Sequence, residues 1–316
     1  MKNITILQPK AEFSEQLQDR LSRLGDITYI DSLREYSLEE LIPLVKHADI
    51  LAFDPDSVGG VEKAPARLQT LLEAMPTVKG LALNTSGFEY VNKEYLRERD
   101  IVTSNAPYYY VEAIAQHTVA LLMGCAKRIF LADRRTKKKK YRLDLGREPS
   151  HLSVGIIGLG HVGERVAKLC QGLGMSVSAY NRTPTRMEFV HRRKLDEILH
   201  SSDVILLHLA LNEETKGFLS LEEIHRIKDG AIVINTAHRL LVNEQEMANA
   251  LKFGRIDQYC FEADSVNGSP LKDIETAIAF KPFGWYTKEA LNRNKEIWVE
   301  NIAGLCRGNP TNRIAL

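Results

Sequence analysis

The sequence predicts an α/β protein in which helices cover both faces of parallel sheets. Short apolar segments typical of buried strands alternate with segments of helical periodicity along most of the chain. The 316 residues are 44% hydrophobic and 26% charged, which is typical of globular proteins and excludes a disordered or collagen-like chain. This length predicts two domains, at roughly 150 residues per domain.

Composition also excludes several classes of partner. The formal net charge of +1 provides no basic surplus for nucleic acid. No stretch reaches the ~18 apolar residues of a membrane-spanning helix, and residues 1–7 lack the features of a signal peptide. The four cysteines lie far apart, which argues against a zinc site or a disulfide framework. We therefore expect a cytoplasmic protein with no metal, no nucleic-acid partner and no membrane partner.

A first strand–helix series occupies residues 4–98. Ser37 and Glu40 have capping-box spacing at the start of an amphipathic helix, and Gly25 follows a helical segment as a left-handed cap would. Strands are expected at 4–7, 27–29, 50–53 and 80–83, and helices at 13–24, 37–47, 67–74 and 93–98.

A second series begins at Ser153. It contains expected strands at 153–157, 177–180, 204–207 and 231–234 and a helix at 161–173. Two further helices are expected at 111–126, which is apolar and rich in alanine, and at 287–305. The basic run at 134–142 is interpreted as a solvated, mobile loop, because the chain as a whole is nearly neutral; the alternative is attraction of an anionic ligand.

A Gly-x-Gly-x-x-Gly motif follows the strand at 153–157 and opens the helix at 161–173. Gly158 permits the tight turn, Gly160 lets a pyrophosphate approach the backbone, and Gly163 lets the helix pack closely against the strand. The helix N-terminus offers free N–H groups and a positive dipole end to phosphates. The motif therefore predicts a Rossmann-type, doubly wound domain that binds a dinucleotide.

The end of the next strand indicates which coenzyme is bound. An NAD site usually has Asp or Glu about 20 residues after the glycines, where the carboxylate binds the ribose hydroxyls. This chain has Asn181, Arg182 and Thr183 instead. Neutral Asn181 does not repel a 2′-phosphate, and Arg182 and Thr183 offer donors to it. We expect a preference for NADP(H), with NAD(H) possible if Arg182 is merely an exposed arginine.

Four segments resemble the D-2-hydroxyacid dehydrogenase family, which includes phosphoglycerate, glyoxylate and D-lactate dehydrogenases. They are residues 105–122, 154–163, 202–217 and 231–237. The resemblance implies a dinucleotide-binding domain at 105–287 and a flavodoxin-like substrate domain formed by 1–104 and 288–316. It also implies a homodimer and a small anionic substrate held in the cleft between the domains.

The reaction implied by the resemblance is hydride transfer between a nicotinamide and a 2-oxo or 2-hydroxy acid. It requires a cation for the carboxylate, an acid/base group and a carboxylate that orients it, and the family uses Arg, His and Glu. At these positions this chain has His238, Phe283 and Asn267, while the family's preceding Asp aligns with Glu262. Three replacements together argue that the ordinary mechanism is absent.

The remaining groups allow a relocated mechanism. His238 would act as acid/base, Arg239 or Lys281 would hold the anionic substrate, and Tyr109 would donate to the carbonyl oxygen. The alternative for His238 is a tolerated replacement in an inactive site. His117 lies on an apolar helix and is interpreted as a core residue.

The expected substrate contacts are more aromatic than is usual for the family, which suits a larger, flatter ligand or a cleft filled by its own side chains. They are Ser86, Gly87, Tyr108, Tyr110, Phe283 and Trp285. The motif and the resemblance together also assign a set of coenzyme contacts. These are Gly158, Gly160, His161, Val162, Asn181, Arg182, Thr183, His208, Leu209, Ala210, Thr215, Thr236, Ala237 and Glu262.

Two functions follow from these observations. The first is an NADP(H)-dependent oxidoreductase of the D-2-hydroxyacid type with non-standard catalytic residues. The second is a catalytically silent coenzyme-binding protein that acts through a partner, by analogy with corepressors that keep this fold.

Overall fold

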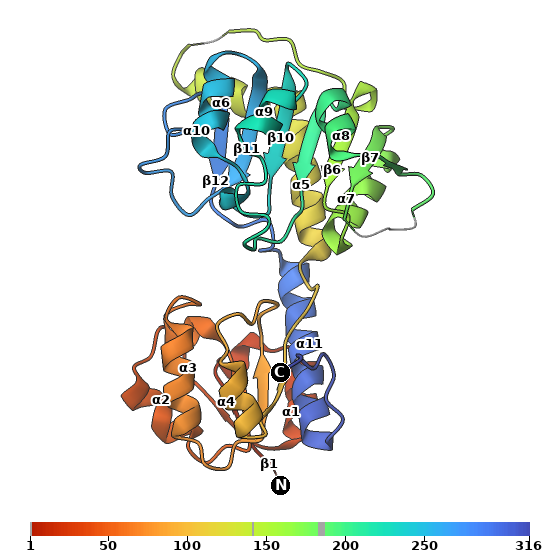
Figure 1. Cartoon of the computed structure of the whole chain (residues 1–316). Coiled ribbons are helices and arrows are strands. Elements are labelled where there is room, and N and C mark those ends of the chain that lie inside the picture. The colour runs from red at the N-terminus through yellow and green to blue at the C-terminus, as the bar shows by residue number, and fades with distance from the viewer. Residues whose placement is uncertain (1, 141, 183–186) are drawn as a thin grey trace. The chain divides into compact units, whose positions relative to one another are not determined.

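A computed structural model describes residues 2–140, 142–182 and 187–316. The chain divides into two compact units (Figure 1). Unit 1 comprises Met1–Tyr109 and Lys288–Leu316, and unit 2 comprises Tyr110–Thr287. No helix within the described residues is both long enough and apolar enough to cross a membrane.

The sheet of unit 1 has five parallel strands in the order β2-β1-β3-β4-β5. This is the flavodoxin-like strand order, so the predicted fold class of this domain is confirmed. The strands are β1 (Lys2–Ile6), β2 (Gly25–Tyr29), β3 (Ile50–Phe53), β4 (Gly80–Leu83) and β5 (Val102–Ser104).

Helices cover both faces of this sheet (Figure 1). They are α1 (Glu15–Ser22), α2 (Leu38–Val45), α3 (Ala64–Glu73), α4 (Lys93–Glu98) and α11 (Lys288–Arg307). On one face, α1 and α11 pack around Trp298, whose indole N–H donates to the carbonyl of Ala82 at 2.9 Å. On the other face, α2, α3 and α4 bury a second apolar cluster that includes Leu41, Leu68 and Leu96. The C-terminal helix is therefore part of the core of unit 1.

The sheet of unit 2 has seven parallel strands in the order β12-β11-β10-β9-β6-β7-β8. The strand order reverses between β6 and β9, as in the Rossmann-type fold that the glycine motif predicts. The strands are β6 (Ser153–Ile157), β7 (Ser176–Tyr180), β8 (His191–Arg192), β9 (Val204–Leu207), β10 (Ala231–Asn235), β11 (Ile256–Glu262) and β12 (Ala277–Phe280).

Two apolar clusters hold helices against the two faces of the sheet. The helices are α5 (Val111–Ala126), α6 (Ile129–Lys137), α7 (His161–Gly172), α8 (Leu195–Ser201), α9 (Leu221–Arg226) and α10 (Glu244–Lys252). The first cluster joins α5 and α7 to the sheet, and the second joins α8, α9 and α10. Both faces of every central strand are buried, which explains their continuous apolar sequences.

The first boundary between the units falls after Tyr109, whereas the sequence placed it after Ser104. Hydrogen bonds explain this difference. The N–H of Ala106 donates to Thr85 at 2.9 Å, and the amide of Asn105 donates to Ser86 at 2.6 Å, so this segment is tied to unit 1.

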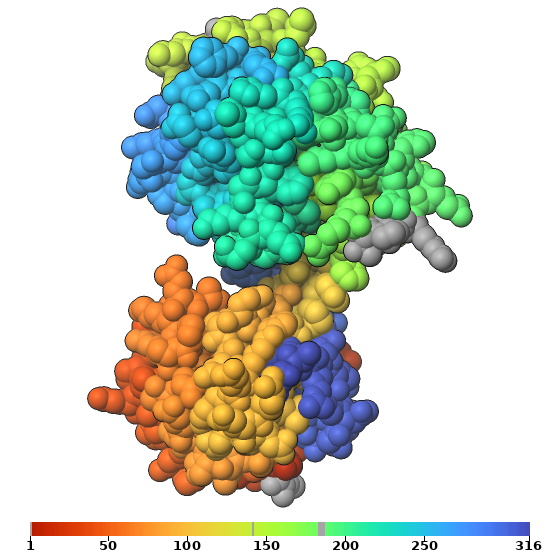
Figure 2. Space-filling model, viewed as in Figure 1, coloured from red at the N-terminus to blue at the C-terminus, as the bar shows by residue number. Residues whose placement is uncertain are grey.

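The basic run at 134–142 differs from the expected loop, because its first residues belong to α6. Arg135 is buried: its guanidinium is paired with Asp144 and donates to Glu275 at 2.7 and 2.9 Å. These paired carboxylates offset the cost of burying the cation. Residues 136–140 and 142 are exposed on the surface of unit 2 (yellow-green in Figure 2), and residue 141 lies outside the described residues.

Candidate active site

A tight glycine turn joins β6 to α7 at the edge of the sheet where the strands end. Gly158 has φ +97°, and a Cβ on it would lie 2.5 Å from the carbonyl oxygen of His208. A Cβ on Gly163 would lie 2.1 Å from the carbonyl oxygen of Gly158. Both positions therefore exclude a side chain, Gly158 for conformation as well as space.

Gly160 is different, because a Cβ placed on it would meet no atom within 4 Å. It is the N-cap of α7, and His161 and Val162 form the first turn of this helix. The open space lies at the point where a helix N-terminus directs N–H groups and its positive dipole end outward. This arrangement fits the pyrophosphate of a nicotinamide dinucleotide, with Gly158, Gly160, His161 and Val162 as the residues that would hold it.

Asn181, directly after β7, supports the same turn. Its Oδ1 accepts the N–H of Leu159 at 3.1 Å. Arg182 follows and is exposed, and its guanidinium donates to Glu214 at 2.7 Å. No carboxylate stands at position 181 or 182, so this strand end lacks the ribose-binding acid of an NAD site. Thr183, the third residue predicted here, lies outside the described residues.

The end of β9 lies beside the glycine turn, because β6 and β9 are neighbours. The N–H of His208 donates to Ile157 at 2.8 Å, while its Nε2 is buried and has no hydrogen-bond partner among the described residues. Burial lowers the pKa of His208 to about 4, so the ring is neutral at pH 7. Leu209 and Ala210 follow, and the hydroxyl of Thr215 donates to the carbonyl of Ala210 at 2.7 Å, which closes the loop.

The segment after β10 carries Thr236, Ala237 and His238. The N–H of Ala237 donates to Asn235 at 3.1 Å, and the side chain of Asn235 donates to the carbonyl of His238 at 2.9 Å. His238 is exposed, and its Nδ1 accepts the N–H of Leu240 at 3.2 Å. The other ring nitrogen therefore carries the proton of the neutral ring and can donate to a ligand.

The guanidinium of Arg239 is bound by other residues of unit 2. It forms two hydrogen bonds to Glu244, at 2.8 and 2.7 Å, and one to the carbonyl of Ser265, at 2.7 Å. This bidentate pairing raises the pKa of Arg239 and fixes the side chain. Its geometry is that of a structural tie to the first residue of α10 and to the loop after β11, although the sequence analysis proposed Arg239 as a cation for the substrate.

Glu262, the last residue of β11, belongs to a cluster that the sequence did not predict. Its Oε1 accepts the N–H groups of Phe283 and Gly284, at 3.0 and 2.9 Å, and lies 3.3 Å from Nε2 of His117. The ring of His117 contacts the ring of Phe283 edge-on, with centroids 4.8 Å apart. Phe283 occupies the position where the resemblance implies a histidine, so His117 lies next to that position.

Lys281 and Trp285 lie on the same segment after β12. Lys281 is exposed, and Trp285 packs edge-on against Tyr286 at 5.2 Å. The ends of β6, β7, β9, β10, β11 and β12 all lie at one edge of the sheet, because the strands are parallel. The structure therefore gathers the described coenzyme residues, His238, Lys281 and Phe283 at a single edge of unit 2.

The other predicted substrate residues belong to unit 1 or to its boundary. Ser86 accepts a hydrogen bond from Asn105, and the Thr85 hydroxyl donates to the carbonyl of Gly87 at 2.8 Å. Tyr108 is exposed with φ +61°, a left-handed conformation that costs a non-glycine residue about 1 kcal/mol. The carbonyl of Tyr109 accepts from Arg293 at 3.1 Å, and Tyr110 is the N-cap of α5.

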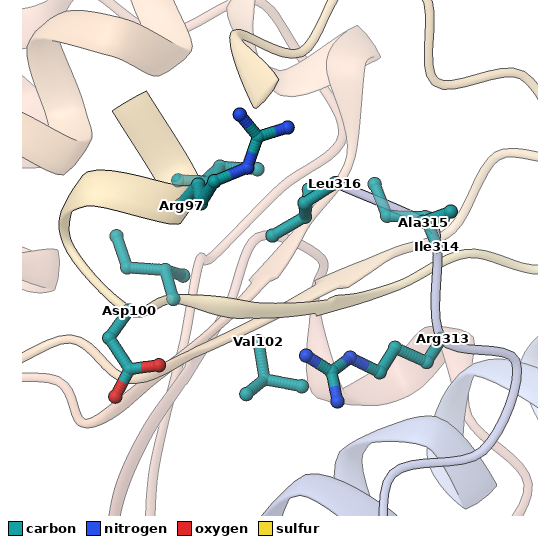
Figure 3. Close-up of a pocket in the computed structure, with 9 residues that line it drawn as sticks. Arg97, Asp100, Val102, Arg313, Ile314, Ala315 and Leu316 are labelled. Carbon is teal, nitrogen blue, oxygen red and sulfur yellow. The ribbon is translucent and has the colours of Figure 1, made fainter. Parts of the chain in front are cut away.

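A cavity of about 390 Å³ in unit 1 is not part of this arrangement (Figure 3). Arg97, Asp100, Val102 and Arg313 are among its lining residues. Val102 is the first residue of β5, so the cavity lies where the strand begins. Ligands of open parallel sheets bind beyond the ends of the strands, at the opposite edge.

Comparisons with known proteins agree with this geometry. Residues 119–279 match the model of the D-isomer specific 2-hydroxyacid dehydrogenase NAD binding domain. The chain belongs to this family. As a member, it is a nicotinamide-dependent oxidoreductase. Within the described residues, no group of three His, Cys, Asp or Glu side chains could hold a metal ion.

Individual relatives of this 2-hydroxyacid dehydrogenase family member span most of its length. The hydroxypyruvate reductase of Blautia hydrogenotrophica is 27% identical over 307 residues, covering 92% of each chain. An aromatic 2-oxoacid reductase of Clostridium sporogenes is 27% identical over 247 residues, covering 71% of this chain and 75% of the relative. A crystal structure of a Thermus thermophilus protein superimposes with a TM-score of 0.82 at 26% identity, covering 99% of this chain and 100% of the other.

Sequence reasoning missed two pairs at this edge. Glu214 lies in the segment 202–217 and had no predicted role, yet it is the ion-pair partner of Arg182. His117 was interpreted as a core residue, yet it faces Glu262. Neither pairing has a signal in the local sequence, since each joins segments that only the fold brings together.

Proposed function

We propose that the protein reduces 2-oxo acids, or related anionic carbonyl compounds, with NADPH. The observation that carries the choice of coenzyme is the strand end at β7, where neutral Asn181 supports the glycine turn and exposed Arg182 follows it. Arg182 is paired with an exposed carboxylate, and a 2′-phosphate would be a stronger partner for the same guanidinium. When bound, the coenzyme supplies the hydride.

The aromatic side chains near the strand ends support a bulky substrate. Phe283 is exposed at the end of unit 2 where the coenzyme residues gather, and Trp285 follows it. A relative in Clostridium sporogenes bears the name of an aromatic 2-oxoacid reductase. We therefore propose a 2-oxo acid with an aromatic or extended apolar side chain, which can stack on or pack against these rings.

His238 and Lys281 are the proposed contacts for the substrate carboxylate. Both are exposed in unit 2, and the orientation of the His238 ring leaves Nε2–H free to donate. Arg239 is a weaker candidate because its guanidinium already binds Glu244. In unit 1, we propose that Tyr109 donates a hydrogen bond to the substrate, and Tyr109→Phe tests this directly.

The deciding experiment measures coenzyme binding and turnover on one preparation. Purified protein is titrated with NADPH and NADH by nicotinamide fluorescence, and absorbance is followed with glyoxylate, hydroxypyruvate, pyruvate, phenylpyruvate and indolepyruvate. We expect tighter binding of NADPH and fastest turnover with the aromatic acids. Binding without turnover of any acid would instead favour the silent coenzyme-binding protein, because the replaced positions His238, Asn267 and Phe283 also fit that function.

We further propose that the protein is a cytoplasmic homodimer. All four cysteines are free thiols, which suits a reducing compartment. Leu143 and Leu145 are 81% and 91% exposed, close together on unit 2, and a second copy could cover them. Light scattering of the wild-type protein and of Leu145→Lys tests the assembly, with a monomeric variant expected.

A further inference from the structure

A histidine–carboxylate pair occurs in unit 2 at the edge of the sheet that carries the glycine turn. His117 lies on α5, and Glu262 is the last residue of β11. The Nε2 of His117 lies 3.3 Å from Oε1 of Glu262, and the two side chains are only 13% and 8% exposed. A carboxylate beside an imidazole stabilises the protonated ring, as general acid catalysis requires.

The backbone fixes this pair at the edge of the sheet. Oε1 of Glu262 accepts two N–H groups from the segment after β12, at Phe283 and Gly284, which hold the carboxylate in place. A Cβ on Gly284 would lie 2.7 Å from the His117 ring, so this glycine makes room for the imidazole. On its other side, the ring contacts Phe283, which is 46% exposed.

The hydrogen bonding of His117 is incomplete. Its Nε2 is buried and makes no hydrogen bond of good geometry among the described residues, although it lies within ion-pair distance of Glu262. A buried ring nitrogen without a hydrogen-bond partner is unfavourable, and a core histidine normally avoids it. With a hydrogen on Nε2, this close approach to Glu262 becomes a hydrogen bond, and the other ring nitrogen is left to meet a ligand.

The charged groups around α5 leave Glu262 as the carboxylate that acts on this ring. On α5 itself, Glu112 is bound by Arg165 of α7, at 2.6 and 2.9 Å. From β10, Thr236 presents a neutral hydroxyl, which lies 2.9 Å from the hydroxyl of Thr118. The segment after β12 presents an aromatic ring and backbone N–H groups.

We propose that His117, positioned by Glu262, is the acid/base catalytic residue of this protein; this inference rests on the proposed 2-oxo acid reduction. During reduction, Glu262 holds the Nε2 side of the ring. The Nδ1–H bond of the imidazolium breaks and an O–H bond forms on the substrate oxygen, and the carbonyl carbon would receive the hydride that bound NADPH supplies. The 2-oxo acid becomes a 2-hydroxy acid, NADPH becomes NADP⁺, and a proton from solvent restores the imidazolium. His238 is then left to bind the substrate carboxylate.

Kinetics of matched variants test the assignment. His117→Gln keeps a polar side chain of similar reach, and we expect kcat to fall roughly 10²–10³-fold while the Kd for NADPH changes less than about twofold. Glu262→Gln should lower kcat by about tenfold and move the alkaline limb of the kcat profile to lower pH, because the imidazolium loses its carboxylate. His225→Gln, an exposed histidine on α9, is the control and should match wild type. Unchanged kcat in His117→Gln would overturn the inference but leave the proposed function intact.

A second measurement does not depend on turnover or on a stable variant. Ring-nitrogen NMR of the NADPH-loaded wild-type protein is recorded with and without oxamate, a carboxylate analogue of a 2-oxo acid. We expect oxamate to shift the His117 ring nitrogens to the values of an imidazolium at pH 7.5, even if no tested acid is turned over. Ring nitrogens of His117 that stay unchanged at saturating oxamate would overturn the inference.

Discussion

Two regions at the same edge of one sheet meet very different requirements. The turn between β6 and α7 keeps all three glycines of the dinucleotide motif, two whose Cβ positions are blocked and one whose Cβ position is open. The ends of β10, β11 and β12 keep their backbone course but carry His238, Glu262 and Phe283. Binding a pyrophosphate depends on backbone geometry, whereas transferring a proton and holding the substrate carboxylate depend on particular side chains. The first region therefore tolerates little change, while the second can relocate its chemistry.

The largest expected effect is at the glycine turn. Gly160→Ala places a methyl group in the open space in front of α7, so the protein should fold normally but lose NADPH affinity by roughly 300-fold or more, about 3–4 kcal/mol. Fluorescence titration measures the affinity and thermal unfolding checks the fold. Gly172→Ala at the end of the same helix also meets no atom and is the control. Normal NADPH binding by Gly160→Ala would contradict the role given to this turn.

The next effect concerns His208, which lies between the two regions at the end of β9. Because the pKa of His208 is about 4 in the folded protein and about 6.5 in an unfolded chain, the unfolded state binds an extra proton between these values. Stability should therefore fall by about 3 kcal/mol as the pH drops from 6.5 to 4. Urea unfolding at several pH values measures this slope.

His208→Gln should flatten that slope, whereas the exposed His225→Gln should leave it unchanged. An equally steep slope in His208→Gln would show that the burial of this ring is not the cause.

A third prediction concerns Arg239, which lies in the second region. Arg239→Gln removes the bidentate partner of Glu244, so the free energy of unfolding should fall by about 2 kcal/mol, with little change in the KM for the 2-oxo acid. Arg23→Gln, which loses an exposed pair with Asp19, should cost well under about 1 kcal/mol. A large rise in KM with unchanged stability would instead show that Arg239 contacts the substrate.

The smallest expected effect is a difference between the affinities for NADPH and NADH. Arg182→Ala should weaken NADPH binding by about tenfold and leave NADH binding unchanged, because only NADPH has the 2′-phosphate. Glu214→Gln releases Arg182 and should strengthen NADPH binding a few-fold. Equal losses for both coenzymes would contradict the proposed contact.

Local sequence was sufficient for much of the fold and for the coenzyme turn. The strand at 153–157 and the helix at 111–126 are found where apolar pattern and length predict them, because four of the five strand residues and half of the helix residues are buried. The glycine motif can be interpreted from the sequence alone, since the φ angle and the space for a Cβ are properties of single residues. Other strands were missed. In β11, Asp257 and Gln258 interrupt the apolar run, and Gln258 is tolerated because its amide donates to the carbonyl of Cys125 at 3.0 Å.

The identity of the active groups depends on contacts between distant segments. The sequence by itself determined the fold class and the dinucleotide turn, because these follow from periodicity and glycine geometry. Only the tertiary structure decided that Arg239 is bound to Glu244, that Arg182 faces Glu214 and that His117 faces Glu262. Such pairings depend on the distance between atoms in space, and residues 117 and 262 are joined only by the packing of α5 against the end of β11.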